Sequence, residues 1–456
     1  MIFERYGASI YINKSINENK RRSLCKSIDS FCVPGIWEKE ECIMRKMKKI
    51  VAALLTGTML ATIFTSCGAS TDSSGTATGD NASTDGTVVK IGSVHPLTGS
   101  YAYEAQQIIN SQQLAIDEIN AAGGISSMGG AKLELVVGDS QASADTGASE
   151  TERLISEGCS IVTGTFQSGV TLTCMQKAEQ NEVPFLVTVS NNVAMFENGF
   201  EWCFRIQPNA DVFANNFIQY ISDIKTDDIK TAVLIHEDSL TGTDSGDIIA
   251  DNMASTGIEL LDRIIYSAST STLSTEVTKL ADLKPDLLIT IGYFADTSLL
   301  VKELNERGIK FKMVCGVANG GISDSKFIED FGDSVENFLD LNYRFNPNSD
   351  KTKALLESYK STYGDDMSVH AVWGYESIYV IADALERAGS SEPKALRDAL
   401  KETNIEEHVL AQSGPITFDE KGENVNAAGV LVQIQDGKHV VVYPKEFAEA
   451  EIRYNE

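Results

Sequence analysis

The sequence predicts an α/β protein made of two doubly wound α/β lobes, and two observations support this fold class. From Val88 onward, near-continuous apolar segments alternate with segments of helical periodicity, a pattern typical of parallel strands buried on both faces. The alternation runs through one series and begins again at Thr231, which indicates a second unit of the same kind. A length of 456 residues also suits two lobes or domains better than one small domain.

The first series opens with the apolar segment Val88–Val94, which predicts a strand. A helix follows over Ala105–Asn120, because its isoleucines fall on one face, and Gly123 and Gly124 end it. The series continues with predicted strands Leu133–Gly138, Cys159–Gly164 and Val183–Val189, and with predicted helices around Ala144–Glu157 and up to Asn181.

The second series has the same pattern and is followed by helices and short strands. Its predicted strands are Thr231–His236, Gly257–Ile265, Asp286–Ile291 and Phe311–Cys315, with predicted helices Asp244–Ser255, Ser274–Leu283 and Thr297–Arg307 between them. Next come predicted helices Thr352–Tyr363, Val372–Ala388 and Pro393–Glu402, and then predicted strands Ile416–Phe418, Gly429–Ile434 and His439–Val442. These late segments can return to either lobe, so we expect hinge crossings near Pro208, Tyr343 and Gly414.

The composition is that of a folded, acidic protein, with 38 Lys+Arg against 65 Asp+Glu and a formal charge of −27. This balance argues against nucleic acid as a partner, because phosphate binding needs a basic face. The charge is uneven, since residues 1–66 carry +5 and the remainder carries the whole acidic surplus. The chain therefore changes character near residue 67.

The basic-to-apolar pattern near this point predicts a targeting segment. Met47, Lys48 and Lys49 precede the apolar run 50–64, which is short for a membrane span, and Cys67 follows two small residues. This arrangement resembles a bacterial lipoprotein signal over 47–66, with Cys67 as the lipid anchor; the alternative is an ordinary secreted protein. Residues 1–46 are interpreted as a mis-called upstream extension, and 67–87 as the anchor and a flexible Gly/Ser/Thr-rich tether.

Cysteine and histidine usage gives little support to metal or redox chemistry. The chain has 8 Cys and 5 His but no C-x-x-C pair, so a zinc or thioredoxin-like site is not expected. Buried free thiols are the favoured state of Cys159, Cys174, Cys203 and Cys315. No cofactor is expected.

Candidate binding residues lie in the loops after the predicted strands, where open α/β sheets bind ligands. These loops are rich in hydroxyls, amides and aromatic rings and poor in paired acid and base groups, which favours recognition over catalysis. Ser168 lies at a predicted helix N-terminus, where a carboxylate gains amide donors and the helix dipole, but a simple helix cap is an equal alternative. The surrounding GTFQSG is not a G-x-S-x-G nucleophile elbow. For Tyr293, ligand binding and core packing remain about even.

Six motifs carry a resemblance to a known family. They are IGSVHPLTG (91–99), INAAGGI (119–125), VTGTFQSGV (162–170), VPFLVTVSNN (183–192), LIHEDSLTG (234–242) and GPITFDEKGE (414–423). In this order they resemble the leucine/isoleucine/valine-binding protein family, the extracytoplasmic substrate-binding components of ABC transporters. The resemblance covers nearly all of the chain after Val88 and implies a type 1 periplasmic-binding clamshell with a three-strand hinge. Lobe 1 would comprise 88–208 with 344–413, and lobe 2 would comprise 209–343 with 414–456.

The resemblance also implies a set of ligand-binding residues. Ser168 resembles the family serine that binds the ligand carboxylate, Ser190 and Asn192 resemble a loop that supplies a carbonyl and a hydroxyl, and Tyr293 resembles a tyrosine of the second lobe. Tyr103 is expected to cover the ligand from the first lobe. Thr241 stands where the family usually has tyrosine, and Asn319 stands near the place of an acidic residue that holds the ligand ammonium. These two departures leave the ligand class open.

The function implied is capture of an amino acid, branched-chain-like, or of an amide-like small solute by lobe closure. The expected partners are this ligand, an ABC permease and, through the lipid anchor, the outer face of the bacterial cell membrane; the protein is expected to be a monomer without nucleic acid and not an enzyme. The alternatives are a ligand-sensing receptor domain of the same fold and a binder of a non-amino-acid solute.

Overall fold

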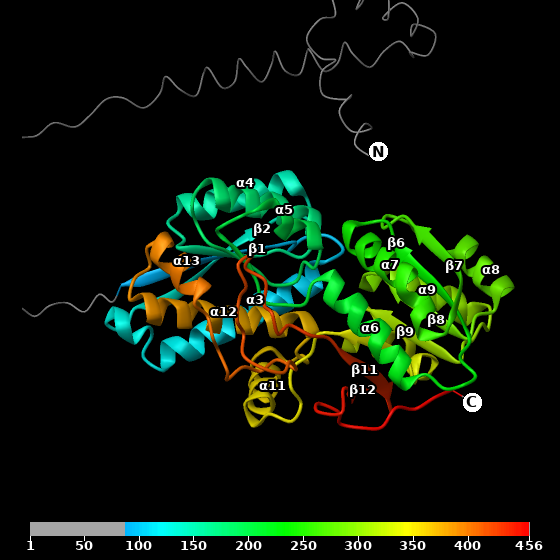
Figure 1. The fold of residues 1–456 in the computed structure, drawn as a ribbon. Helices are drawn as coiled ribbons and strands as arrows, with labels where there is room; N and C mark the ends of the chain where they lie inside the picture. The colour runs from blue at the N-terminus through cyan, green and yellow to red at the C-terminus, as the bar shows by residue number, and fades with distance from the viewer. Residues whose placement is uncertain (1–86, 456) are drawn as a thin grey trace, which may run out of the picture. The chain divides into compact units, whose positions relative to one another are not determined.

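The computed structural model describes residues 87–455, which fold around two separate β-sheets (Figure 1). The predicted extension, signal, Cys67 anchor and nearly all of the tether lie outside the described residues. Within the described part of the chain, no helix is both long and apolar enough to span a membrane.

The first sheet has the strand order β2-β1-β3-β4-β5 and is parallel throughout. Short apolar runs form these strands because both faces of the sheet are covered by helices. We call the part of the chain built on it the first lobe. Its elements are β1 (Val88–His95), α3 (Ala102–Ala121), η1 (Ser126–Met128), β2 (Lys132–Asp139), α4 (Ala144–Ser156), β3 (Ile161–Gly164), α5 (Ser168–Gln180), β4 (Phe185–Val187), η2 (Val193–Asn198) and β5 (Cys203–Arg205).

The second sheet has the order β12-β11-β10-β9-β8-β6-β7, in which only β11 and β12 pair antiparallel with their neighbours. We call this part the second lobe. Its elements are α6 (Ala210–Ile224), β6 (Thr231–Glu237), α7 (Leu240–Asn252), η3 (Met253–Thr256), β7 (Glu259–Tyr266), α8 (Ser274–Leu283), β8 (Leu287–Ile291), α9 (Phe294–Glu306), β9 (Met313–Val317), α10 (Ser325–Phe331), η4 (Gly332–Val335), β10 (Leu339–Asn342), β11 (Val430–Gln435) and β12 (Lys438–Tyr443).

The late helices return to the first lobe before the chain enters β11. In Figure 1, α11 (Asp350–Tyr363), α12 (Val369–Ala388) and α13 (Pro393–Lys401) follow the second lobe in sequence, and α12 packs along α3. The chain therefore crosses between the lobes after β5, after β10 and again before β11. The segment after Gly414 first returns to β5, where Glu423 forms an isolated parallel bridge with Arg205, and only then reaches Val430.

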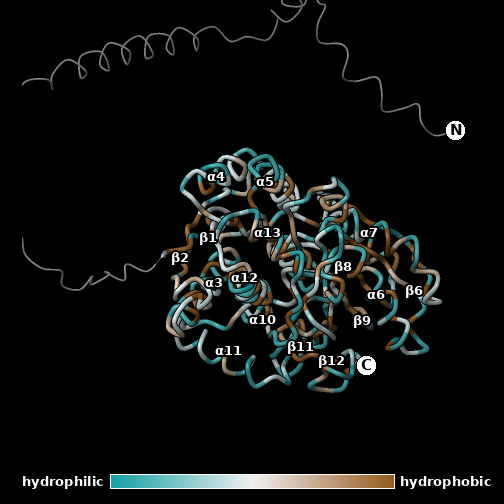
Figure 2. The backbone as a smooth tube through the Cα atoms, turned by 60° about the vertical axis from the view of Figure 1, so that its left-hand side comes forward, coloured by the Kyte–Doolittle hydropathy of each residue, from teal (hydrophilic) through white to brown (hydrophobic). Residues whose placement is uncertain are grey.

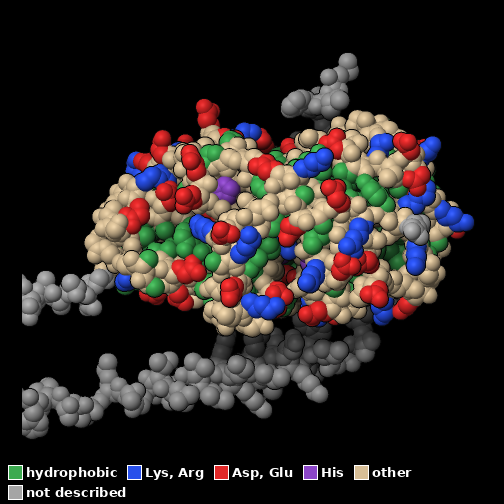
Figure 3. Space-filling view, turned by 90° about the horizontal axis from the view of Figure 1, so that it is seen from below, with side chains coloured by type: hydrophobic (Ala, Val, Ile, Leu, Met, Phe, Trp, Pro, Cys, Tyr) green, Lys and Arg blue, Asp and Glu red, His purple; other side chains and the backbone are tan. Residues whose placement is uncertain are grey.

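Apolar side chains fill both faces of each sheet. In the first lobe, Ile91 and Leu186 pack with the α3 side of the core, and Val94 and Val187 pack with α4 and α5 on the other face. This alternation follows from the period of two along a strand. Figure 2 shows hydrophobic stretches towards the middle of each lobe and hydrophilic stretches along outer loops and helices. On the face shown in Figure 3, acidic and basic side chains are interspersed.

The α/β class and the restart of the alternation near Thr231 are confirmed, but some elements differ from the sequence prediction. The short strands β5 and β10 and the amphipathic helix α6 were not predicted. The predicted strand Ile416–Phe418 was wrong, because these residues form only isolated bridges, from Ile416 to Ile405 and from Phe418 to Asn424. The predicted lobe limits at 208, 343 and 413 stay a prediction.

Candidate functional site

Each sheet has a topological switch point, where the strand order reverses, and the two switch points face each other between the lobes. In the first sheet the strand order reverses at β1 and β3, and in the second it reverses at β6 and β8. Open parallel sheets bind ligands beyond the carboxyl ends of strands at such points. The connections that follow these strands, with the first turns of the next helices, carry Tyr101, Ser168, Thr241 and Tyr293.

Ser168 is the first residue of α5 and is buried. The N-cap of α5 is Gln167, whose side chain makes no capping hydrogen bond, so the hydroxyl of Ser168 is not the helix cap. The first amides of a helix lack carbonyl partners within it and carry its positive dipole end. Ser168 therefore places a hydroxyl beside a group of amides suited to an anionic ligand atom.

The second lobe meets Ser168 directly. Thr241 lies in the first turn of α7, and its Oγ1 is 3.3 Å from Oγ of Ser168. The turn is held by Ser239, the N-cap of α7, whose hydroxyl accepts from the amide of Thr241. Two hydroxyls from opposite lobes thus come together at the predicted carboxylate site.

An aromatic cluster stands beside these hydroxyls. The ring of Tyr101 lies 5.5 Å from Phe166 and 5.2 Å from Tyr293, and Phe166 lies 6.1 Å from Tyr293, measured between centroids. Tyr293 comes from the second lobe and the other two rings come from the first. Tyr103 instead lies at the surface, where its hydroxyl donates to Asp365 at 3.1 Å. Its predicted ligand contact stays a prediction, and Tyr101 and Phe166 are site residues that the sequence analysis did not single out.

Two buried carboxyl groups stand on the second-lobe side of the site. Glu237 accepts from the hydroxyl of Ser239 and the amide of Gly242, and Asp296 accepts from the hydroxyl of Tyr266 at 2.6 Å. Within residues 87–455, neither carboxyl pairs with a Lys or Arg. Burial is the main cause that raises the pKa of both carboxyls and of Tyr293. The site therefore has amide donors on one lobe and carboxyl groups on the other.

The predicted loop residues Ser190 and Asn192 lie beside the site but have partners within the protein. The hydroxyl of Ser190 donates to the carbonyl of Phe166 at 3.1 Å and contacts the hydroxyl of Thr171. The side-chain amide of Asn192 donates to Asp244 of the second lobe. The direct ligand contacts of these two residues stay predictions.

Asn319 is buried and organises its own loop. Its side-chain oxygen accepts from the hydroxyl of Thr297 at 3.1 Å and from the amides of Gly321 and Ile322. The same loop is held by Asp340 of β10, which accepts from the hydroxyl of Ser323 at 2.5 Å. The structure thus shows Asn319 as a loop-holding residue, and its contact with a ligand stays a prediction.

The buried carboxyl of Asp340 should make the free energy of unfolding depend on pH. Burial raises its pKa to about 7 from the usual value of 3.8, so the folded state binds more protons than the unfolded state between about pH 4 and pH 7. Stability falls with rising pH wherever the folded state binds more protons, so Asp340 should destabilise the protein increasingly across this window. In Asp340→Asn this decrease of stability with rising pH should be absent. Urea titrations at several pH values test this, and parallel pH profiles for the two proteins would contradict it.

Two histidines at the ends of the central strands are buried or hydrogen-bonded within the protein. His95 is buried at the end of β1, and burial lowers its pKa to about 3. The ring of His236 is held at both nitrogens, by the guanidinium of Arg263 at 2.8 Å and the carbonyl of Glu237 at 2.7 Å. Cys159, Cys174, Cys203 and Cys315 are free and buried. Among the described residues, no group of three or more His, Cys, Asp or Glu could hold a metal ion.

Comparison with known proteins assigns this architecture to a family. The family described as periplasmic binding protein matches residues 88–438. Among curated proteins, Leu/Ile/Val-binding protein homolog 7 of Brucella suis is 30% identical over 381 residues, covering 80% of this chain and 94% of the relative.

Two solved structures share the fold. The isoleucine complex of the branched-chain amino acid transporter substrate binding protein LivJ from Streptococcus pneumoniae has a TM-score of 0.68 at 23% identity, covering 81% of this chain and all of that one. A solute binding protein from R. palustris in complex with benzoate also has a TM-score of 0.68, at 18% identity, covering 78% of this chain and 95% of that one. With its two α/β sheets and the family match over most of its length, the chain belongs to the leucine/isoleucine/valine-binding group of the periplasmic binding protein family.

Proposed function

We propose that this protein is the extracytoplasmic substrate-binding component of an ABC importer, which captures a small carboxylate-bearing solute between its lobes. One observation carries the proposal most directly: Ser168 at the start of α5 faces Thr241 of the other lobe at 3.3 Å. A solute bound there would contact both lobes at once. Its binding energy would therefore favour the closed arrangement over the open one.

The polarity of the site favours an amino acid as the ligand. The amides and hydroxyl at the start of α5 suit a carboxylate, and the buried carboxyls Glu237 and Asp296 give the opposite lobe oxygen acceptors suited to an ammonium group. Tyr101, Phe166 and Tyr293 provide apolar area for a side chain. The isoleucine and benzoate named for two structural relatives both carry a carboxylate, which supports this group as the common feature.

Binding without turnover is the proposed activity. The hydroxyl of Ser168 lies beside Thr241 and not beside a histidine, and His236 has both ring nitrogens engaged. A nucleophile needs a base within hydrogen-bond reach, and these residues do not supply one. A non-amino-acid carboxylate is the second candidate ligand, because Thr241 and Asn319 depart from the family pattern.

Thermal unfolding with single compounds tests the proposal. L-Leucine, L-isoleucine, L-valine, an amide of each and benzoate are each added at millimolar concentration. A ligand present at a hundred times its Kd stabilises the folded state by about 2.7 kcal/mol, so a true ligand should raise the unfolding temperature clearly. D-Leucine is the matched control for the amino acids. A panel without any shift would contradict a carboxylate-bearing solute as the ligand.

We also propose that Cys67 carries a lipid that holds the protein at the outer face of the membrane, next to its permease. The basic and apolar residues of 47–66 and the tether support this location. Growth with a radioactive fatty acid should label the wild type and leave Cys67→Ser unlabelled and released into the medium. An unlabelled wild type would contradict the anchor.

A further inference from the structure

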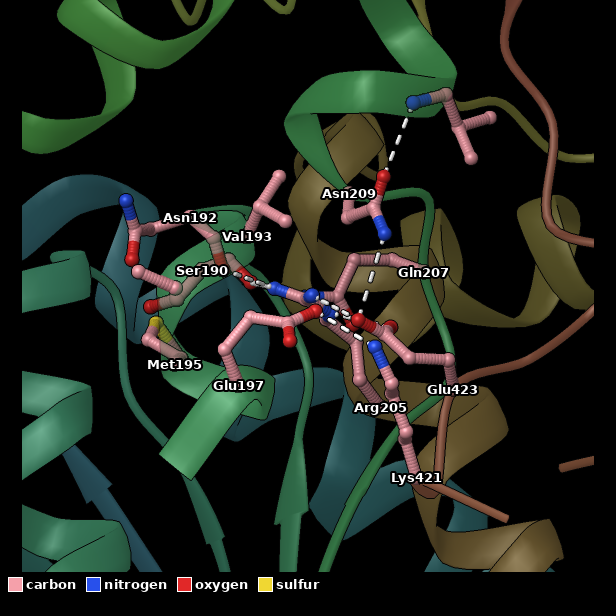
Figure 4. A network of polar contacts seen from close by, with 12 residues as sticks. Ser190, Asn192, Val193, Met195, Glu197, Arg205, Gln207, Asn209, Lys421 and Glu423 are labelled. Atoms are coloured by element: carbon pink, nitrogen blue, oxygen red, sulfur yellow. Dashed lines mark hydrogen bonds and ion pairs between the residues drawn. The ribbon is translucent and has the colours of Figure 1, made fainter. Parts of the chain in front are cut away.

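Arg205 is a fully buried arginine at the end of β5, directly behind the loop 190–193 (Figure 4). Its Nη1 donates to the carbonyl of Asn192 at 2.8 Å and to that of Ser190 at 3.3 Å. Its guanidinium also lies over the ring of Phe196, 4.4 Å from the centroid. The single nitrogen Nη1 thus holds two carbonyls, and the fork of Nε and Nη2 is left for a carboxylate.

The carbonyl of Asn191, between these two, is held as well. The amide of Ala210 donates to the carbonyl of Asn191 at 2.8 Å, and Nε2 of Gln207 donates to that of Ser190 at 2.7 Å. Three consecutive carbonyls thus accept hydrogen bonds from β5, from the crossing that follows it and from the start of α6. The hinge side of the loop is therefore held through the carbonyls of Ser190, Asn191 and Asn192.

The charge of Arg205 is balanced by Glu423, which lies in the segment that leads from α13 to β11. Glu423 binds the guanidinium through both carboxylate oxygens, with 2.8 Å between Nε and Oε2, and it also accepts from Asn209 at 3.3 Å. The preceding residue, Gly422, has φ +88°, and a Cβ there would lie 2.2 Å from the carbonyl of Cys203. The segment therefore approaches β5 as closely as backbone allows, which fixes Glu423 against Arg205.

The opposite side of the loop reaches the second lobe. The side-chain amide of Asn192 and the backbone amide of Val193, the latter at 3.3 Å, both donate to Asp244 of α7. These contacts join the lobes next to the contact between Ser168 and Thr241. The loop therefore lies between an ion pair at the hinge and an interlobe hydrogen-bond pair.

We propose that Arg205 and Glu423 are positioning residues for lobe closure: the ion pair holds loop 190–193 in the conformation that lets Asn192 and Val193 bind Asp244. The proposal rests on the function proposed above and adds to it the residues that link the hinge to the closing contact. Asn192 then serves as the closing contact in place of a direct ligand residue. Neither Glu423 nor Asp244 touches the other, so any energetic link between them passes through the loop.

A double-mutant cycle tests this link with L-leucine as the probe. Glu423→Gln keeps the shape of the side chain and removes its charge, and Asp244→Ala removes the interlobe acceptor. Each single variant should weaken L-leucine binding about tenfold, in line with loss of a charge-assisted hydrogen bond. The double variant should also lose about tenfold, because a loop released by either change no longer forms the contact that the other removes. A loss of about a hundredfold in the double variant, or no loss in Glu423→Gln, would overturn the proposal.

The ion pair between Lys421 and Glu197 supplies a matched control. It joins the same crossing segment to η2 but makes no contact with the loop carbonyls, and both side chains are more than half exposed. Lys421→Met should therefore leave L-leucine affinity within about twofold, as expected for an exposed ion pair. If Lys421→Met weakened L-leucine binding as much as Glu423→Gln, the loss would belong to the crossing segment as a whole. That result would overturn the specific role of Glu423.

Hydrogen exchange decides the proposal even if L-leucine is not a ligand. In the ligand-free protein, Glu423→Gln should speed exchange of the amides of Val193 and Ala210 about tenfold or more, because the hydrogen bonds of both amides depend on the loop conformation. Amides of β8 should exchange as in the wild type. Unchanged protection at Val193 and Ala210, or equal loss of protection in β8, would show that the ion pair does not position the loop.

Discussion

Replacing Arg205 with methionine should lower the free energy of unfolding by about 3–5 kcal/mol, because removal of one partner from a buried ion pair leaves an uncompensated charge. The side chain of Arg205 is fully buried, and that of Glu423 is 15% exposed. Methionine fills much of the same volume, so the loss measures the ion pair and its carbonyl bonds more than packing. The effect is a large share of the 5–15 kcal/mol that stabilises a typical protein.

Urea unfolding followed by circular dichroism measures this loss. Lys421→Met, which breaks the neighbouring exposed pair with Glu197, should leave the same quantity nearly unchanged. The double replacement Arg205→Met with Glu423→Leu should recover part of the loss, because no charge is then left unpaired. A single Arg205→Met variant as stable as the wild type would mean that solvent reaches Glu423 freely.

Ser168→Ala should weaken ligand binding by about ten- to a hundredfold, or about 1.5–3 kcal/mol, if the ligand carboxylate lies at the start of α5. The ligand would lose one hydrogen-bond partner in a buried site. The fold should persist, because the hydroxyl does not cap the helix and its partner Thr241 is half-buried. Titration calorimetry with the compound that gives the largest thermal shift measures the change.

Thr173→Val is the matched control for Ser168→Ala. Thr173 lies on the same helix, and its hydroxyl donates to the carbonyls of Val170 and Ala144, within the first lobe. Its loss should change the thermal stability slightly and the ligand affinity by less than about twofold. Equal affinities of the wild type and Ser168→Ala would remove Ser168 from the binding site.

The strands and helices of the sequence prediction were set by local periodicity, which the chain displays clearly. α6 was missed although Phe213, Phe217 and Ile221 recur at helical spacing, so its signal was present in the sequence. β5 and β10 have only three and four residues, too few for a periodic pattern to distinguish them from loops.

The identity of the site residues depends more on tertiary contacts than on local sequence patterns. Ser168 and Tyr293 follow strands at the switch points, which motif order and loop position made predictable. The choice between Tyr101 and Tyr103 depends on where α3 begins: Tyr101 is its N-cap residue and packs between the lobes, whereas Tyr103 lies one residue inside the helix. Arg205 and Glu423 are 218 residues apart, and no local pattern joins them.

The pairing of α3 with α12 has a consequence for biosynthesis. α3 ends at Ala121 and α12 begins at Val369, so the ribosome makes the second lobe from α6 through β10 before the helix that covers α3 exists. At about 5–20 residues per second, this interval lasts roughly 10–50 seconds. During that time the nascent first lobe exposes the apolar side of α3, including Leu114 and Ala115, which pack into the core of the finished protein. Newly made chains should therefore depend on holding chaperones until α12 emerges.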